Sequence, residues 1–148
     1  MKSSSTIGMA QIAPVFLNRE ATTKKMLAYL TDAASRQCDL VIFGKVLLPG
    51  YPFWIELTNG DAFNSSVQKE LYAYYACQAV SVASGDLNRI CEIAREKKVM
   101  VILGFIERAE DRGGYSLYCS LANISQQGVI QYIYRKVMPT YEERVYWT

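Results

Sequence analysis

The fold of this chain follows from one stretch, Asp39-Leu40-Val41-Ile42-Phe43-Gly44-Lys45-Val46-Leu47-Leu48-Pro49-Gly50-Tyr51-Pro52. Its apolar first part is typical of a strand buried in a sheet. Pro49, Gly50 and Pro52 then indicate a turn. Lys45 lies between the two, at the carboxyl end of the predicted strand, where open α/β sheets place their functional groups. Lys45 is therefore the first candidate for a functional site.

The residues before this stretch predict a strand and a helix. The apolar run 7–12 is closed by Pro14 and indicates a first buried strand. Asn18 is a suitable N-cap for a helix over 19–36. The apolar residues of this helix share one face: Met26, Leu27, Leu30, Ala33 and Ala34. Strand, helix and second strand form a βαβ unit with a right-handed crossover, whose strands need not be adjacent.

Two more helices are predicted from capping signals. Ser65 followed by Gln68 fits a capping box for a helix that reaches about Gln78. Asp86 is the expected cap of the next helix. The apolar residues Leu87, Ile90, Cys91 and Ala94 define one face of that helix.

The remaining strands complete a mixed sheet. The run 99–106 is continuously apolar, which predicts a central strand covered on both faces. Segments 115–124 and 129–137 indicate two antiparallel strands joined by the turn 125–128, which ends in Gly128. The predicted architecture is α/β, a mixed sheet with helices on one face.

Composition excludes several classes of protein. The chain has 148 residues, of which 51% are hydrophobic and 20% charged, which suits one folded domain. A net charge of +2 argues against nucleic acid and anionic membranes as partners. The longest apolar runs are too short to span a bilayer, and the polar start 1–6 is unlike a secretory leader. We therefore expect a cytoplasmic protein.

The four cysteines are Cys38, Cys77, Cys91 and Cys119. They form no C-x-x-C pair, and the chain has no histidine to complete a zinc site. We expect four buried, reduced thiols. The alternative is that one is a nucleophile, which would require a nearby base or cation to lower the thiol pKa.

The loop 51–64 is rich in aromatic residues. Tyr51, Phe53, Trp54 and Phe63 are candidates for the wall of an apolar substrate pocket. Packing of the loop onto the sheet explains the same residues equally well. Tyr51 and Trp54 are the substrate-binding residues that we predict.

Three segments together resemble the nitrilases, a branch of the carbon–nitrogen hydrolases. They are the strand that leads through Lys45 into Leu-Pro-Gly-Tyr-Pro-Phe-Trp, the segment Gly104-Phe105-Ile106-Glu107-Arg108, and Arg135-Lys136-Val137-Met138-Pro139-Thr140-Tyr141-Glu142-Glu143-Arg144. The resemblance extends over residues 6–147. It implies that 1–148 is the first half of a nitrilase-type α-β-β-α sandwich, a carbon–nitrogen hydrolase domain truncated at its carboxyl end.

The resemblance also implies roles for individual residues. Lys136 matches the lysine of the family, and Glu143 matches a second glutamate that positions this lysine and the substrate. Lys45 stands where the family has the glutamate that acts as general base. The segment with the nucleophilic cysteine would come after Thr148. From charge pattern alone, these residues would instead form exposed ion pairs on the surface.

A lysine at position 45 has consequences for the expected site. Beside Lys136, its ammonium group would disfavour the charged form of its neighbour. A Lys45→Glu substitution would then create an opposite-charge pair and raise stability. Glu143 would be the remaining carboxylate in the site.

Two functions fit the resemblance. The first is a nitrilase that converts a small-molecule nitrile to a carboxylic acid and ammonia by a Cys-Glu-Lys mechanism, of which this chain alone is inactive. The second is a non-catalytic protein of the same fold that serves as a partner or assembly protein. No cofactor or metal is implied, and a half-sandwich with an uncovered apolar face is expected to form a homo-oligomer.

Overall fold

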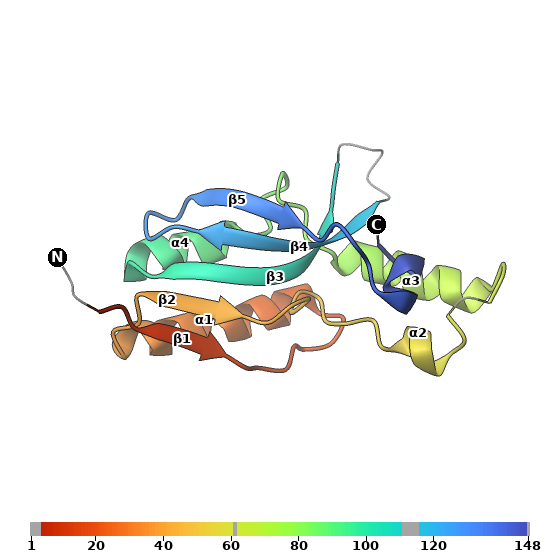
Figure 1. The fold of residues 1–148 in the computed structure, drawn as a ribbon, viewed down its shortest axis with the longest axis horizontal. Coiled ribbons are helices and arrows are strands. Elements are labelled where there is room, and N and C mark those ends of the chain that lie inside the picture. Colours follow the sequence, from red (N-terminus) through yellow and green to blue (C-terminus); the bar gives the residue numbers. More distant parts are fainter. Residues whose placement is uncertain (1–3, 61, 111–115, 148) are drawn as a thin grey trace.

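The computed structural model describes residues 4–60, 62–110 and 116–147. Its centre is a five-stranded mixed sheet in the order β1-β2-β3-β4-β5 (Figure 1). The strands are β1 Ile7–Ala10, β2 Leu40–Phe43, β3 Met100–Arg108, β4 Leu117–Ile124 and β5 Ile130–Arg135. β1, β2 and β3 pair in parallel, and β4 pairs antiparallel to both β3 and β5. The carboxyl ends of β1, β2, β3 and β5 therefore point to the same edge of the sheet.

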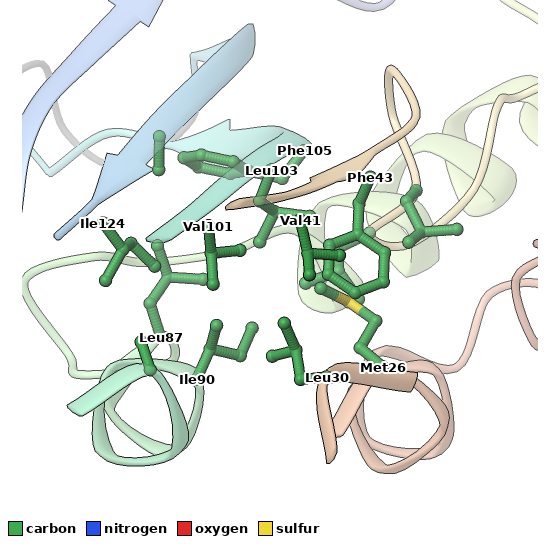
Figure 2. Packing of buried hydrophobic residues seen from close by; sticks show 14 of the residues in the cluster. Met26, Leu30, Val41, Phe43, Leu87, Ile90, Val101, Leu103, Phe105 and Ile124 are labelled. Carbon is green, nitrogen blue, oxygen red and sulfur yellow. The ribbon is translucent and has the colours of Figure 1, made fainter. Parts of the chain in front are cut away.

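Two helices, α1 (Arg19–Ser35) and α4 (Asn88–Lys97), cover one face of the sheet. Figure 2 shows the core that they share with the strands: Met26 and Leu30 of α1, and Leu87 and Ile90 at the start of α4, point up to the sheet, where Val101 of β3 is part of the same cluster. All five side chains are at most 1% exposed. The buried residues of β2 and β3 alternate along the strands (Val41 and Phe43; Val101, Leu103 and Phe105), and their burial fixes which face of each strand meets the helices.

The βαβ prediction is confirmed, and the structure decides the adjacency that the sequence left open. β1 and β2 are direct neighbours, with Ile7 paired to Leu40. The side chain of Asn18 caps α1 by accepting a hydrogen bond from the Ala21 amide at 2.9 Å. Ser65 caps α3 (Ser66–Gln78) by accepting a hydrogen bond from the Gln68 amide at 3.4 Å, but the predicted capping box is incomplete, because the Gln68 side chain donates to the Thr58 carbonyl at 3.0 Å.

The predicted cap at Asp86 is wrong. α4 follows Leu87 and has no side-chain cap. The carboxylate of Asp86 instead accepts a hydrogen bond from the Ser81 amide at 2.8 Å and forms an ion pair with Arg19 at 2.9 Å. These contacts tie the loop before α4 to the start of α1, an interaction of distant segments that local sequence does not reveal.

The prediction of a central strand covered on both faces is correct for the carboxyl-terminal half of β3, where Phe105 and Ile106 point to opposite faces and are both fully buried, and wrong for its amino-terminal half. β3 extends to Arg108, and its residues on the helix side, Val101, Leu103 and Phe105, are fully buried. Met100 and Ile102, which point to the other side, are only partly buried. The turn 125–128 is confirmed by a hydrogen bond from the Gly128 amide to the Ser125 carbonyl at 2.9 Å.

A second, aromatic core lies beyond the carboxyl ends of the strands. It joins α2 (Trp54–Leu57), α3 and the 3₁₀ helix Tyr141–Val145, which gather at that end of the sheet (Figure 1). Its buried members include Trp54, Tyr75, Tyr146 and Trp147. This core packs the carboxyl-terminal segment against the sheet edge where the site lies.

All four cysteines are free thiols. Cys119 is buried and Cys38 and Cys91 are partly buried, but Cys77 is exposed on α3, contrary to the prediction that all four are buried. In the described part of the chain, no helix has the length and apolar character needed to cross a membrane.

Candidate functional site

Lys45 and Lys136 meet at one edge of the sheet. Lys45 follows β2 and Lys136 follows β5, two strands that point in the same direction. The carboxylate of Glu143, from the 3₁₀ helix, lies between their ammonium groups. Lys136 donates to its Oε2 at 2.6 Å, and Lys45 donates to its Oε1. The structure thus brings together the three residues predicted for catalysis.

Thr140 holds this carboxylate in place. Its amide donates to Oε2 of Glu143 at 2.9 Å, and its hydroxyl accepts a hydrogen bond from Lys136 at 3.0 Å. Thr140 and Glu143 form a capping box at the start of the 3₁₀ helix. Thr140 is not among the residues predicted for the site, although its position three residues before Glu143 is the signal of such a box.

Gly104 determines where Lys45 lies. The segment after β2 crosses over β3 at this glycine, and the Leu47 amide donates to the Gly104 carbonyl at 3.0 Å. A Cβ on Gly104 would be 2.7 Å from the Gly44 carbonyl oxygen and 2.7 Å from the Cα of Lys45. Only glycine permits this approach of two backbones.

We expect Gly104→Ala to lower the free energy of unfolding by about 2–3 kcal/mol, since backbone atoms must move to admit the methyl group. Gly44→Ala is the matched control, because nothing lies within 4 Å of a Cβ at that position. Urea denaturation of both variants measures the difference. Equal midpoints would show that the crossing is not tight.

The electrostatics of the site centre on Glu143, whose side chain is 5% exposed. Burial by itself would raise its pKa, but hydrogen bonds from Lys136, Lys45 and the Thr140 amide outweigh this effect and lower the pKa to about 2. Burial acts to lower the pKa of Lys45, and the hydrogen bond to Glu143 outweighs it, so that this pKa is raised.

The predicted mutual repulsion of the two lysines is therefore wrong. Glu143 separates their charges and stabilises the charged form of Lys45. We now expect Lys45→Glu to lower stability, not to raise it, because the new carboxylate would face Glu143. Two acidic groups would then compete for Lys136.

An apolar hollow of about 500 Å³ adjoins the lysines on the sheet face opposite α1 and α4. Its walls include Ile42, Ile102, Leu121 and Tyr134, and Lys45, Lys136 and Cys119 also line it. Burial raises the pKa of the Cys119 thiol, which outweighs the opposing effect of Lys45. The thiol is therefore protonated at neutral pH, which does not favour a nucleophilic role.

The two residues predicted to bind substrate lie apart from the walls of this hollow. Trp54 is 7% exposed, and its indole N–H donates to the Tyr146 hydroxyl at 2.8 Å within the aromatic core. Tyr51 packs edge-on against Trp147 at 6.1 Å between ring centroids. These positions agree with the alternative in which the aromatic loop packs onto the protein.

Residues 6–148 match the carbon–nitrogen hydrolase family. Similar curated proteins include Nitrilase 2 of an unknown prokaryotic organism, which is 37% identical over 97% of this chain and 44% of its own length. Arylacetonitrilase of Aspergillus oryzae is 34% identical over 96% of this chain and 39% of its own length. The chain spans less than half the length of these relatives.

Solved structures of similar fold include an amidase of the nitrilase superfamily from Nesterenkonia AN1, with a TM-score of 0.70 at 15% identity over 99% of this chain and 49% of that chain. A carbon–nitrogen hydrolase from Helicobacter pylori G27 has a TM-score of 0.59 at 20% identity, covering 97% of this chain and 44% of that chain. At these identities the likeness concerns the fold. It confirms the predicted fold class, the first half of a nitrilase-type sandwich.

Proposed function

This chain belongs to the carbon–nitrogen hydrolase family, and on this premise we propose that it is the amino-terminal part of a nitrilase that converts nitriles to carboxylic acids and ammonia. The curated relatives with nitrilase names support the reaction class. The short coverage of those relatives and the uncovered apolar face support a domain that continues beyond this chain.

The proposal rests mainly on the hydrogen-bonded cluster of Lys136, Thr140 and Glu143 at the edge of the sheet where the carboxyl ends of β1, β2, β3 and β5 lie. In the proposed reaction a cysteine thiolate adds to the nitrile carbon, and two water molecules are consumed as acid and ammonia leave. Lys136 stabilises the negative charge that develops at nitrogen, and Glu143 fixes the position of Lys136. Thr140 supports both residues.

Lys45 opposes this chemistry, because an ammonium group with a raised pKa does not accept a proton at neutral pH. We propose that the chain by itself does not hydrolyse nitriles, since both the general base and the nucleophile of the mechanism are missing from it. The second candidate, a non-catalytic partner protein, is favoured by the ion pair that Lys45 forms with Glu143.

Ammonia release from phenylacetonitrile tests the proposal. We expect no turnover by the chain, by Lys45→Glu, or by the unmodified chain mixed with the carboxyl-terminal half of the prokaryotic relative. Turnover is expected when that half is mixed with Lys45→Glu, and it should disappear in Lys45→Glu/Lys136→Met. Light scattering on each sample reports whether the chain forms the proposed homo-oligomer or the mixed complex.

Two results would contradict the proposal. Turnover by the unmodified chain alone would show that one of its four cysteines is a nucleophile. A stable mixed complex of Lys45→Glu that remains inactive would favour the non-catalytic function.

A further inference from the structure

β5 contains one residue more than the part of β4 with which it pairs. Ile124 of β4 pairs with Ile130, whereas the residue before it, Asn123, pairs with Tyr132. Gln131 is the extra residue, so this is a β-bulge, in which two residues of one strand oppose one residue of the other. Because side chains alternate between the two faces of a strand, the bulge exchanges the faces of all later residues of β5.

The bulge determines which of two consecutive cations faces the candidate site. Ile130 and Ile133 are three residues apart, yet both pack against the core beneath α1 and α4. Arg135 follows Ile133 by two residues and therefore shares this helix side of the sheet. Lys136 points to the opposite side, where it meets Glu143. In a strand without the bulge, Lys136 would point to the helix side and Arg135 to the site.

Burial of apolar side chains gives little preference between these two registers. Ile133, on the helix side, is only partly buried. Tyr132 and Tyr134, on the other side, are 56% and 59% exposed. The ring of a tyrosine is large and apolar and can also pack against a core. Another contact must therefore fix the register of β5.

The carboxylate of Glu107 distinguishes the two cations. It is 8% exposed and binds Arg135 through two hydrogen bonds of 2.9 and 2.7 Å. The Ser120 hydroxyl donates to it at 2.6 Å, and the guanidinium carbon lies 4.2 Å from the centre of the Tyr118 ring. The planar fork of an arginine fits a carboxylate at two points, whereas the ammonium group of a lysine is a single point charge.

We propose that Glu107 is a positioning residue, which binds Arg135 and thereby fixes the register of β5 that presents Lys136 to Glu143. The inference rests on the proposed function in one respect, namely that Lys136 is the cation that acts on the nitrile nitrogen. The register is a property of this chain alone, so it can be measured without turnover.

Nuclear Overhauser effects between β4 and β5 report the register directly. In the unmodified chain they should connect Ala122 with Ile133, its partner in the ladder. In Glu107→Met, at least about a third of the molecules should instead connect Ala122 with Tyr132, because the two-point contact that favours arginine on the helix side is lost. Glu107→Gln, which keeps the shape of the side chain, should show a smaller population of the same slipped register.

Deletion of Gln131 is the matched rescue. Without this residue, Ile130, Ile133 and Arg135 follow one another at every second position, and alternation alone places them on the helix side. Adding the deletion to Glu107→Met should therefore restore a single register. A role of Glu107 in stability alone would not be relieved by removing a residue from another strand.

Leu30→Ala is the control for loss of stability. Leu30 is 1% exposed on α1, so this variant is destabilised through the core and should keep the native register. In the mixed complex that contains Lys45→Glu, adding Glu107→Met should lower kcat in proportion to the slipped fraction and leave KM unchanged. A mixed complex without turnover counts against the proposed function, while the measured register still decides this inference.

Three results would overturn the role of Glu107. The first is a single native register in both Glu107→Met and Glu107→Gln. The second is a slipped fraction in Leu30→Ala as large as that in Glu107→Met. The third is a slipped fraction that persists when Gln131 is deleted.

Discussion

Replacing Glu143 by glutamine is expected to lower the free energy of unfolding at pH 7 by about 2–3 kcal/mol. The carboxylate of Glu143 is buried and accepts hydrogen bonds from Lys45, Lys136 and the Thr140 amide. The variant leaves two ammonium groups close together without a counter-charge. Both lysines are partly exposed, and hydration reduces the loss below the value for a fully buried pair.

The stability difference between the wild type and Glu143→Gln is expected to depend on pH. The pKa of Glu143 is lowered in the folded protein from 4.5 to about 2. Its contribution to stability is therefore complete above about pH 5 and disappears as the pH falls through about 2. The difference in stability between the two proteins should shrink over this interval.

Urea denaturation at several pH values between 7 and 2 measures this difference. Glu142→Gln is the control, because Glu142 is exposed on the same 3₁₀ helix. A difference between wild type and Glu143→Gln that is constant with pH would contradict the ionised, doubly paired carboxylate. An effect of Glu142→Gln as large as that of Glu143→Gln would do the same.

The second large effect concerns the buried carboxylate of Glu107. Arg135 binds it through two hydrogen bonds of 2.9 and 2.7 Å, and the Ser120 hydroxyl donates to it at 2.6 Å. These contacts join β3, β4 and β5 one residue before Lys136. We expect Glu107→Met to lower the free energy of unfolding by about 2 kcal/mol, because the guanidinium group of Arg135 loses the buried carboxylate that it pairs with, and its own 39% exposure reduces the loss.

The double variant Glu107→Met/Arg135→Met separates loss of the ion pair from loss of packing. Removing both charges should recover at least half of the stability lost in the single variant, since neither member of this ion pair then remains. Thermal unfolding of the wild type, both single variants and the double variant completes the cycle. A double variant less stable than Glu107→Met would show that the arginine is held by other contacts.

The sequence predicted much of the fold because the relevant signals are local. Apolar runs marked the strands, and Asn18 and Ser65 marked the starts of two helices. Asp86 does not cap the helix, because its carboxylate accepts a hydrogen bond from the nearby Ser81 amide and pairs with Arg19. Arg19 is far from Asp86 in the sequence and meets it only in the folded chain. The prediction about the faces of β3 failed only at Met100 and Ile102, because an apolar run does not show how far a covering layer extends along a strand.

The resemblance predicted which side chains would meet at the candidate site, but it did not predict how they pair. The motif resemblance pointed to Lys45, Lys136 and Glu143, which the structure places in one cluster. That the carboxylate lies between the lysines depends on the 3₁₀ helix and its capping box, and thus on packing of the chain end. The aromatic residues show the same limit, because composition could not distinguish a pocket wall from the buried contacts of Trp54.

The capping box links the stability of the 3₁₀ helix Tyr141–Val145 to the ion pairs of the site. One carboxylate, that of Glu143, both completes the capping box of the 3₁₀ helix and pairs with the two lysines. A ligand that draws an ammonium group away from Glu143 changes the stability of this helix, and the helix changes the affinity for the ligand by the same free energy. Folding of the 3₁₀ helix Tyr141–Val145 and binding of a ligand to Lys45 or Lys136 are therefore thermodynamically linked.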